Sequence, residues 1–195
     1  EALTHYRRAV EAYARAFGDR WDHVQRATLE RKIGEAFFGR GDHQQAIDCL
    51  HRALGLLGAP LPTTPGAVTR VLAREVLRQV GHRVLPRRLW RVRTVGAVDR
   101  ERLYIYRMMP WIDYCLDKTR YVLDVLVMLN VSESRDDTAG TVLGCTGVGI
   151  MCDHLAASRV AGWYHRRTLA SAEASGERRA AGHAHLRLAF HESYL

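Results

Sequence analysis

Two thiols and an imidazole in the C-terminal half are the residues best suited by type to hold a metal ion: Cys145, Cys152 and His154. Thiolate and imidazole groups are good ligands for Zn²⁺. Structural zinc sites, however, usually bring their ligands in pairs two to four residues apart, whereas these cysteines are seven apart and have no matching second pair. We therefore expect no metal and no cofactor. All four cysteines, which include Cys49 and Cys115, are expected as buried, reduced thiols inside helices.

The histidines show no arrangement that predicts catalysis. The spacing identifies no serine, cysteine or carboxylate as a catalytic partner for any of them, so we expect them at the surface or at helix caps. The three nearest the C-terminus are spaced by two and by six, which does not place them on one helix face as i and i+4 ligands. We predict no catalytic residue in this chain. The six considered are His51, His154, His165, His183, His185 and His191.

A glycine series, Gly144-x-x-Gly147-x-Gly149, has some likeness to a phosphate-binding loop. The pattern predicts no strand before it, and no Lys-Ser/Thr pair follows the last glycine, so that interpretation is weak. Small residues are also what a close contact between helices requires. We expect these glycines at such a contact, in a helix weakened by about 1 kcal/mol per glycine relative to alanine.

Residues 70–93 are the most cationic stretch of a chain whose net charge is +8. One interpretation is a nucleic-acid-binding module in which arginines neutralise phosphates and a tryptophan stacks on a base. The other, which we favour, is an amphipathic helix with a solvated basic face opposite an apolar stripe that includes Val76, Val80 and Val84, its arginines lying along apolar surface or pairing with acidic residues elsewhere in a parent protein. The candidate basic patch is Arg74, Arg78, Arg83, Arg87, Arg88 and Trp90.

A helical hairpin over residues 29–58 is the element around which the chain is organised. Apolar residues recur at helical spacing on both sides of the breaker Gly41-Asp42. Gly34 and Ala46 are small enough to let two helix backbones approach, while Leu50 fills the volume beside them. The spacing Ala46, Leu50, Ala53 returns as Ala2, Tyr6, Ala9 and as Ala161, His165, Thr168.

These patterns predict an all-α fold, an α-solenoid of antiparallel hairpins. We expect helix breaks near residues 18, 41, 59–65, 117, 134–137 and 176, with Thr64 and Pro65 starting the basic helix and Pro110 kinking or restarting another. The predicted sections are hairpins over 1–58, a proline-rich connection and basic helix over 59–97, and further hairpins over 98–195.

The hairpin resembles a tetratricopeptide (TPR) repeat, with Ile33-Gly34, Phe37, the Gly-Asp turn and then Ala46, Leu50 and Ala53. Over most of its length, and most strongly from Arg31 to Leu89, the chain is similar to the TPR region of large bacterial signalling proteins that couple an AAA or STAND-type ATPase to a nucleotide cyclase or Ser/Thr kinase. That resemblance implies a regulatory arm for protein or peptide partners, or for other domains of the same chain. It also implies that Arg31, Glu35 and Phe38 face the binding groove; a second core aromatic is the alternative for Phe38.

Composition agrees with a folded helical protein. The 195 residues are 47% hydrophobic and 26% charged, enough to bury a sizeable core. No apolar run approaches the roughly 18 to 20 residues that span a bilayer, and no secretory leader pattern begins the chain, so we expect a cytoplasmic location without membrane binding. A start within a helical pattern and without Met suggests a segment of a longer protein. We therefore predict a non-catalytic scaffold for protein interaction or sensing.

Overall fold

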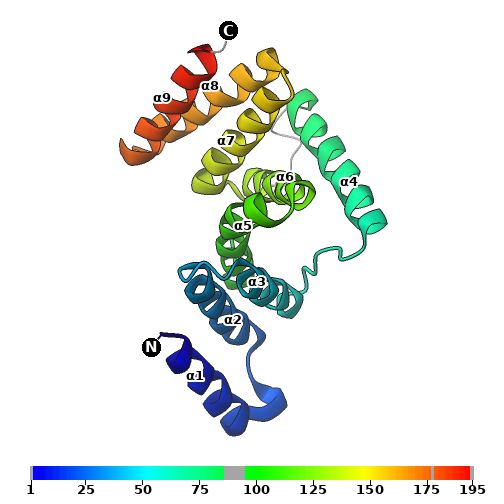
Figure 1. Ribbon diagram of the computed structural model, residues 1–195, viewed down its shortest axis with the longest axis vertical. Coiled ribbons are helices and arrows are strands. Elements are labelled where there is room, and N and C mark those ends of the chain that lie inside the picture. The colour runs from blue at the N-terminus through cyan, green and yellow to red at the C-terminus, as the bar shows by residue number, and fades with distance from the viewer. Residues whose placement is uncertain (1, 86–94, 177, 194–195) are drawn as a thin grey trace. The chain divides into compact units, whose positions relative to one another are not determined.

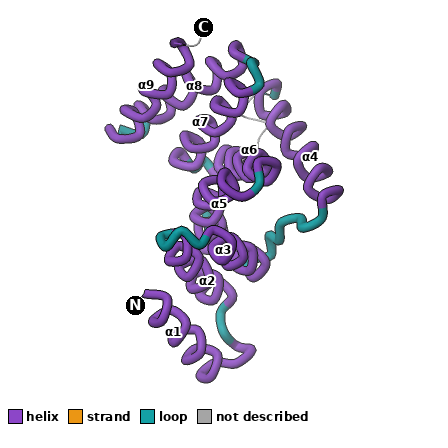
Figure 2. The backbone as a smooth tube through the Cα atoms, viewed as in Figure 1, coloured by secondary structure: helices purple, strands orange, loops and turns teal. Residues whose placement is uncertain are grey.

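The computed structural model describes residues 2–85, 95–176 and 178–193, and these residues are helical with no strand (Figure 2). The all-α prediction is confirmed. None of these helices combines the length and the apolar composition that a bilayer crossing requires. The elements, labelled in Figure 1, are α1 (Ala2–Phe17), a 3-10 turn η1 (Gly18–Arg20), α2 (His23–Phe38), α3 (His43–Leu56), α4 (Pro65–Val84), α5 (Ala97–Leu116), α6 (Lys118–Arg135), α7 (Thr138–His154), α8 (Ser158–Ala174) and α9 (Arg178–Ser193).

The helix boundaries follow the predicted breaks and have local causes. Asp22 and Asp42 cap the N-termini of α2 and α3 by accepting hydrogen bonds from backbone N–H groups of the first turn. Gly41, with φ of +80°, sits between these helices in a backbone conformation that favours glycine. Pro110 was expected to kink or restart a helix; it lies inside an uninterrupted α5, so the restart is excluded and the kink stays a prediction.

The chain forms two compact units that are interleaved along the sequence. Unit 1 comprises Glu1–Val68 and Val95–Tyr121, and unit 2 comprises Thr69–Thr94 and Val122–Leu195. The boundary falls within α4 and α6, so each of these helices contributes to both units. The three consecutive sections expected from the sequence follow hairpin patterns along the chain, whereas the two units follow packing in space. The three sections therefore stay a prediction.

Unit 1 is built on the α2–α3 hairpin. A Cβ placed on Gly34 would lie 3.1 Å from Leu50 Cδ2 and 3.2 Å from the Ala46 carbonyl oxygen, so the two backbones approach closely where the sequence predicts. Leu50, Ala53 and Leu54 are fully buried. Helix α1 packs on α2, and α5 packs on both α2 and α3. The apolar core of this unit therefore lies where these helices meet.

Unit 2 contains the α7–α8 hairpin, with α9 packed on both helices (Figure 1). Helix α7 comes closest to its neighbouring helices at its glycines. A Cβ on Gly144 would lie 2.9 Å from the Cα of Leu129 in α6, and one on Gly147 would lie 2.8 Å from a methyl group of Val125. These distances confirm the expectation that the glycines mark helix contacts.

The apolar stripe expected on α4 is packed only in part: Val68 is buried and Val71 and Leu72 are half-buried, but the later part of the helix packs in unit 2 by its polar side. Val80 and Val84 are 52% and 75% exposed, whereas Glu75 and Gln79 are each only 4% exposed. The reason is a polar partner on α6: Asn130 Nδ2 donates to the Glu75 carbonyl oxygen at 2.9 Å and to its Oε2 at 3.0 Å. A buried carboxylate with hydrogen bonds replaces apolar packing at this contact.

The cysteines follow the sequence expectation in part. Cys49 and Cys145 are buried, and burial raises the pKa of Cys145 to about 11. Cys152 is half-buried and its pKa is also raised by burial. Cys115 is exposed, contrary to expectation, because it lies on the last turn of α5, on the side that carries exposed Trp111.

Candidate functional sites

Arg31 is the centre of a polar cluster between α2 and α5 in unit 1. Its Nε donates to Glu101 Oε1 at 2.5 Å, its Nη1 pairs with Glu35, and its guanidinium lies 5.2 Å from the centre of the Tyr104 ring. Burial alone would lower the pKa of Arg31, but the hydrogen bond and negative charge of Glu101 raise it above its ordinary value. The side chain is therefore a fixed cation, and it holds the exposed Tyr104 ring in place.

An aromatic stripe on α5 continues from this cluster. Tyr104, Trp111 and Tyr114 are 46%, 61% and 49% exposed, and their spacing of seven and three places them on one helix face. Arg107 lies 5.7 Å from the centre of the Tyr104 ring. The opposite side of the helix, with Leu103, Ile105, Met109 and Ile112, is buried. We call the set Arg31, Glu35, Tyr104, Arg107, Trp111 and Tyr114 the α2–α5 face.

The three partner-binding residues expected from the TPR resemblance occupy one side of α2, since they are spaced by four and three. Arg31 pairs with Glu35, and Phe37 lies in the core at 7% exposure. The binding role of Arg31, Glu35 and Phe38 stays a prediction. Phe38 is half-buried, and its ring centre lies 5.4 Å from that of His43 in the next helix. The two sequence interpretations of Phe38, as an interaction anchor or a core aromatic, both remain open.

The described arginines of the candidate basic patch do not act as one surface, because they contact different partners. Arg74 pairs with Glu75 at 3.0 Å, and Arg78 donates to Ser134 Oγ at 2.6 Å. Arg83 points toward α6 and α8, where it pairs with Glu133 at 3.1 Å. Arg87, Arg88 and Trp90 lie outside the described residues, so the nucleic-acid interpretation stays a prediction. Arginines of α4, expected either to lie along apolar surface or to pair with acidic residues elsewhere in a parent protein, thus find acidic partners within unit 2.

Glu133 of α6 is the shared acidic partner of several basic side chains in unit 2. Its side chain is 1% exposed, and it accepts hydrogen bonds from His82 Nδ1 at 2.5 Å, from Arg83 and from Arg167 of α8. Burial by itself raises the pKa of Glu133, yet the His82 hydrogen bond and the two guanidinium groups lower it below its ordinary 4.5. Arg83 also stacks on Trp163, 4.2 Å from the ring centre. This buried anion holds α4, α6 and α8 together.

A second buried cluster joins the last three helices of unit 2. Asp153 of α7 accepts a hydrogen bond from His165 Nε2 of α8 at 2.8 Å through Oδ2, and one from His191 Nδ1 of α9 at 2.6 Å through Oδ1. The two imidazole ring centres are 5.2 Å apart. The expectation that these histidines lie at the surface or cap helices is wrong, because they are 1% and 4% exposed.

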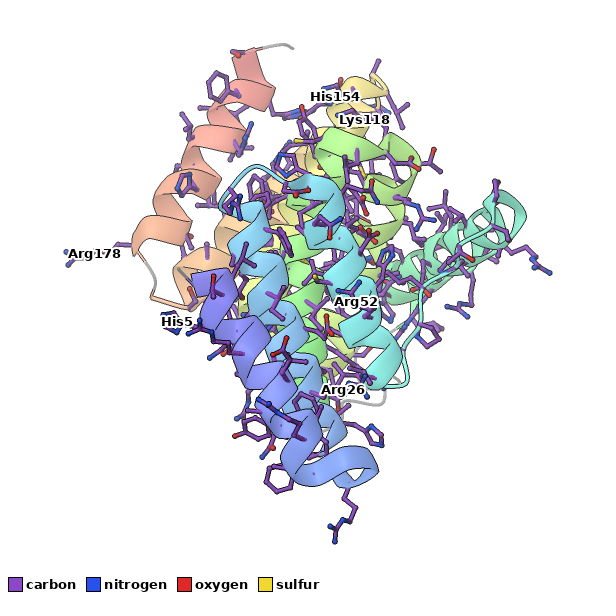
Figure 3. All side chains as sticks on the ribbon, turned by 60° about the horizontal axis from the view of Figure 1, so that its bottom comes forward. His5, Arg26, Arg52, Lys118, His154 and Arg178 are labelled. Carbon is purple, nitrogen blue, oxygen red and sulfur yellow. The ribbon has the colours of Figure 1, made fainter. Side chains whose placement is uncertain are left out.

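The charge of Asp153 suits this position. Burial alone would raise the pKa of Asp153, but hydrogen bonds from His165 and His191 lower it overall, so the carboxylate is the stable form. Its side chain keeps 29% exposure, which leaves a path from solvent to the cluster. His154, the next residue, is exposed at the end of α7 and its Nδ1 lies 2.7 Å from the Ile150 carbonyl oxygen (Figure 3). The metal-ligand types that gather are therefore Asp153, His165 and His191, and not the set Cys145, Cys152 and His154 considered from the sequence.

The sequence pattern does not reveal this cluster, because its members are twelve and twenty-six residues apart and lie on three different helices. One signal was present. His165 follows Gly149 by sixteen residues, as Leu50 follows Gly34, and in both hairpins the glycine faces that residue. A histidine at a position that packs as a buried leucine in the sister hairpin indicates a polar partner nearby.

No protein-family model, curated protein or solved structure matches this chain. The TPR resemblance accordingly rests on the residues quoted above.

Proposed function

We propose that the chain is a TPR-like α-solenoid scaffold that binds a peptide segment of a protein partner on the α2–α5 face. What supports the repeat architecture is the shared register of two hairpins: Gly34 faces Leu50 in α2–α3, and Gly149 faces His165 in α7–α8, at the same separation of sixteen. Two hairpins with one internal geometry are the expected units of a helical repeat.

The observation that carries the binding role is the exposure of Trp111. An indole that is 61% exposed, on a helix whose other side is fully packed, leaves a large apolar area in water. Tyrosine, tryptophan and arginine are the residue types most enriched at the energetic centres of protein interfaces. Tyr104, held by Arg31 and Arg107, adds rings and cations to the same face.

The chemistry of the face indicates the kind of peptide. Trp111 and Tyr114 offer apolar contact, while Arg107 and Lys118, which lies 3.6 Å from the Tyr114 ring centre, offer positive charge. A chain with net charge +8 also attracts acidic segments at long range. We therefore propose a peptide that carries an apolar side chain beside carboxylates.

Within this proposal the chain is a regulatory segment of a larger cytoplasmic signalling protein of the bacterial ATPase type that it resembles. Binding at the α2–α5 face then controls an effector domain located elsewhere in the polypeptide. The segment itself supplies recognition and no catalytic step.

Panning a random-sequence peptide library against the immobilised 195-residue chain tests the proposal. We expect enriched peptides to contain carboxylates next to an apolar residue. Trp111→Ala should weaken their binding at least about tenfold, because truncation of a central aromatic at an interface commonly costs more than 1 kcal/mol. Fluorescence anisotropy with labelled peptides measures the change.

The matched control is Phe190→Ala, which removes a similarly exposed aromatic (50%) from α9 in unit 2. It should leave peptide affinity unchanged. Enriched peptides that bind Trp111→Ala as well as the parent chain, or a failure to enrich any peptide, would contradict the proposed face. Phe38→Ala then decides the role of Phe38: a loss of stability with unchanged affinity assigns it to the core.

A further inference from the structure

We propose that Asp153, His165 and His191 form a binding site for a divalent transition-metal ion that fastens α9 to the α7–α8 hairpin. One ligand comes from each helix. Among the described residues, their carboxylate and imidazole atoms all lie within 4.8 Å of one another, close enough to converge on one ion.

The geometry needs little adjustment to accept an ion. Ligand atoms on a tetrahedral ion with bonds of about 2.0 to 2.1 Å lie about 3.4 Å apart. The two imidazole–carboxylate pairs stand at 2.6 and 2.8 Å, so each must open by under about 1 Å, and no ligand atom has to move more than about 1 Å to converge. Rotation of the three side chains supplies that movement without a change in the helices.

Ligand type selects the class of ion. Two imidazoles and one carboxylate suit Zn²⁺ and neighbouring first-row ions, whereas Mg²⁺ and Ca²⁺ prefer all-oxygen sets. Asp153 provides the carboxylate ligand. Its partly exposed carboxylate also lets solvent reach the site and complete the coordination sphere, as in zinc sites with three protein ligands.

Packing alone does not account for His165. The sister hairpin places fully buried Leu50 against its glycine, whereas unit 2 places an imidazole there at 1% exposure. The second ring nitrogen of His165, Nδ1, is buried and has no hydrogen-bond partner. A buried polar atom without a partner costs stability, so a residue chosen for the core alone would be apolar. We infer that the imidazole is retained for its Nε2 atom, which faces Asp153 and would bind the ion, while Nδ1 stays unpaired.

Zinc chloride is the probe, titrated by calorimetry into the full 195-residue chain after removal of metals with a chelator. We expect one tight site per chain, and at a free zinc concentration one hundred times the Kd a rise in Tm of about 5–10 °C. Far-UV circular dichroism confirms that each variant is folded.

Two variants remove ligands and one is a matched control. His165→Leu copies the Leu50 environment and keeps the packing, and His191→Gln removes the α9 ligand; each should weaken zinc binding at least about 100-fold. His154→Ala deletes the exposed neighbouring imidazole and should bind zinc like the parent chain. The proposal is wrong if the parent chain shows no tight site, or if His165→Leu and His191→Gln bind zinc as the parent does. In that outcome the cluster is a hydrogen-bonded link between helices.

Discussion

The hairpins α2–α3 and α7–α8 have the same internal register but different interiors. In the first, Gly34 faces Leu50 and the contact is apolar; in the second, Gly149 faces His165, which is hydrogen-bonded to a carboxylate. Unit 2 also buries Glu133 among two arginines and a histidine. One helical geometry is thus used once for packing and once to hold polar groups in fixed positions.

The contrast between an apolar and a polar hairpin interior indicates where binding sites lie in a helical repeat. Polar groups in a core cost stability unless they are fully paired, and proteins depart from the stable apolar solution mainly where function requires it. Unit 1, which contains the apolar hairpin, carries its candidate function outside, on the exposed rings of α5 in the α2–α5 face. The polar hairpin carries it inside, at Asp153, His165 and His191.

The largest expected effect compares the two residues that face the glycines. Leu50→Ala should destabilise the chain by about 2–5 kcal/mol, because it removes fully buried methyl groups and leaves a cavity. His165→Leu, measured without metal, should change stability by less than about 1 kcal/mol, since leucine fits this register and Asp153 stays partly solvated. Urea unfolding measures both. A loss of several kcal/mol in His165→Leu would show that the polar contact is a stability element.

A smaller effect is expected at the buried charge of unit 2. Glu133→Gln should cost about 2 kcal/mol at pH 7, because His82, Arg83 and Arg167 lose a charged acceptor. Glu173→Gln is the matched control, since Glu173 is 56% exposed and lies 3.5 Å from His185, and it should change stability little.

That contribution of Glu133 should depend on pH in a defined direction. Its pKa in the folded chain is below the ordinary 4.5, so the unfolded chain binds the proton first. The stability that the carboxylate contributes is therefore present above pH 4.5 and is lost as pH falls through the lower folded pKa. The stability difference between the parent chain and Glu133→Gln should shrink over that range in urea titrations at successive pH values. A difference that is constant from pH 7 into that acidic range would contradict the assignment.

Two glycine contacts, one in each unit, should respond differently to the same substitution. Gly144→Ala places a methyl group 2.9 Å from the Leu129 Cα, a backbone atom that cannot move freely, and should cost about 2 kcal/mol. Gly34→Ala meets the end of the Leu50 side chain at 3.1 Å, and the higher helix propensity of alanine, about 1 kcal/mol, should roughly offset the crowding. Equal losses in the two variants would show that the α6–α7 contact at Gly144 is no tighter than the α2–α3 contact at Gly34.

Local signals in the sequence were sufficient for the helices and their breaks. Gly41-Asp42, Thr64-Pro65 and the acidic turn before α7 act through backbone conformation and capping, which depend on near neighbours. The close approach at Gly34 was predictable because its partner residues belong to the adjacent helix of the same hairpin.

Exposure and long-range pairing were not predictable in the same way. Tyr104 and Trp111 stand in one apolar run with Met109, and only packing on α2 and α3 decides which side of α5 is buried. Helix α4 leaves Val80 and Val84 exposed because Asn130 and Glu133, more than fifty residues away, bind its polar side. These choices depend on partners that periodicity within one helix does not reveal.

Anomalous X-ray scattering at the zinc edge, from crystals of the chain grown with zinc, tests most directly the claim that the second hairpin holds a ligand where the first holds a leucine. We predict one peak about 2.0–2.2 Å from His165 Nε2, His191 Nδ1 and an Asp153 oxygen. No peak between these side chains, with the 2.6 and 2.8 Å hydrogen bonds intact, would contradict it.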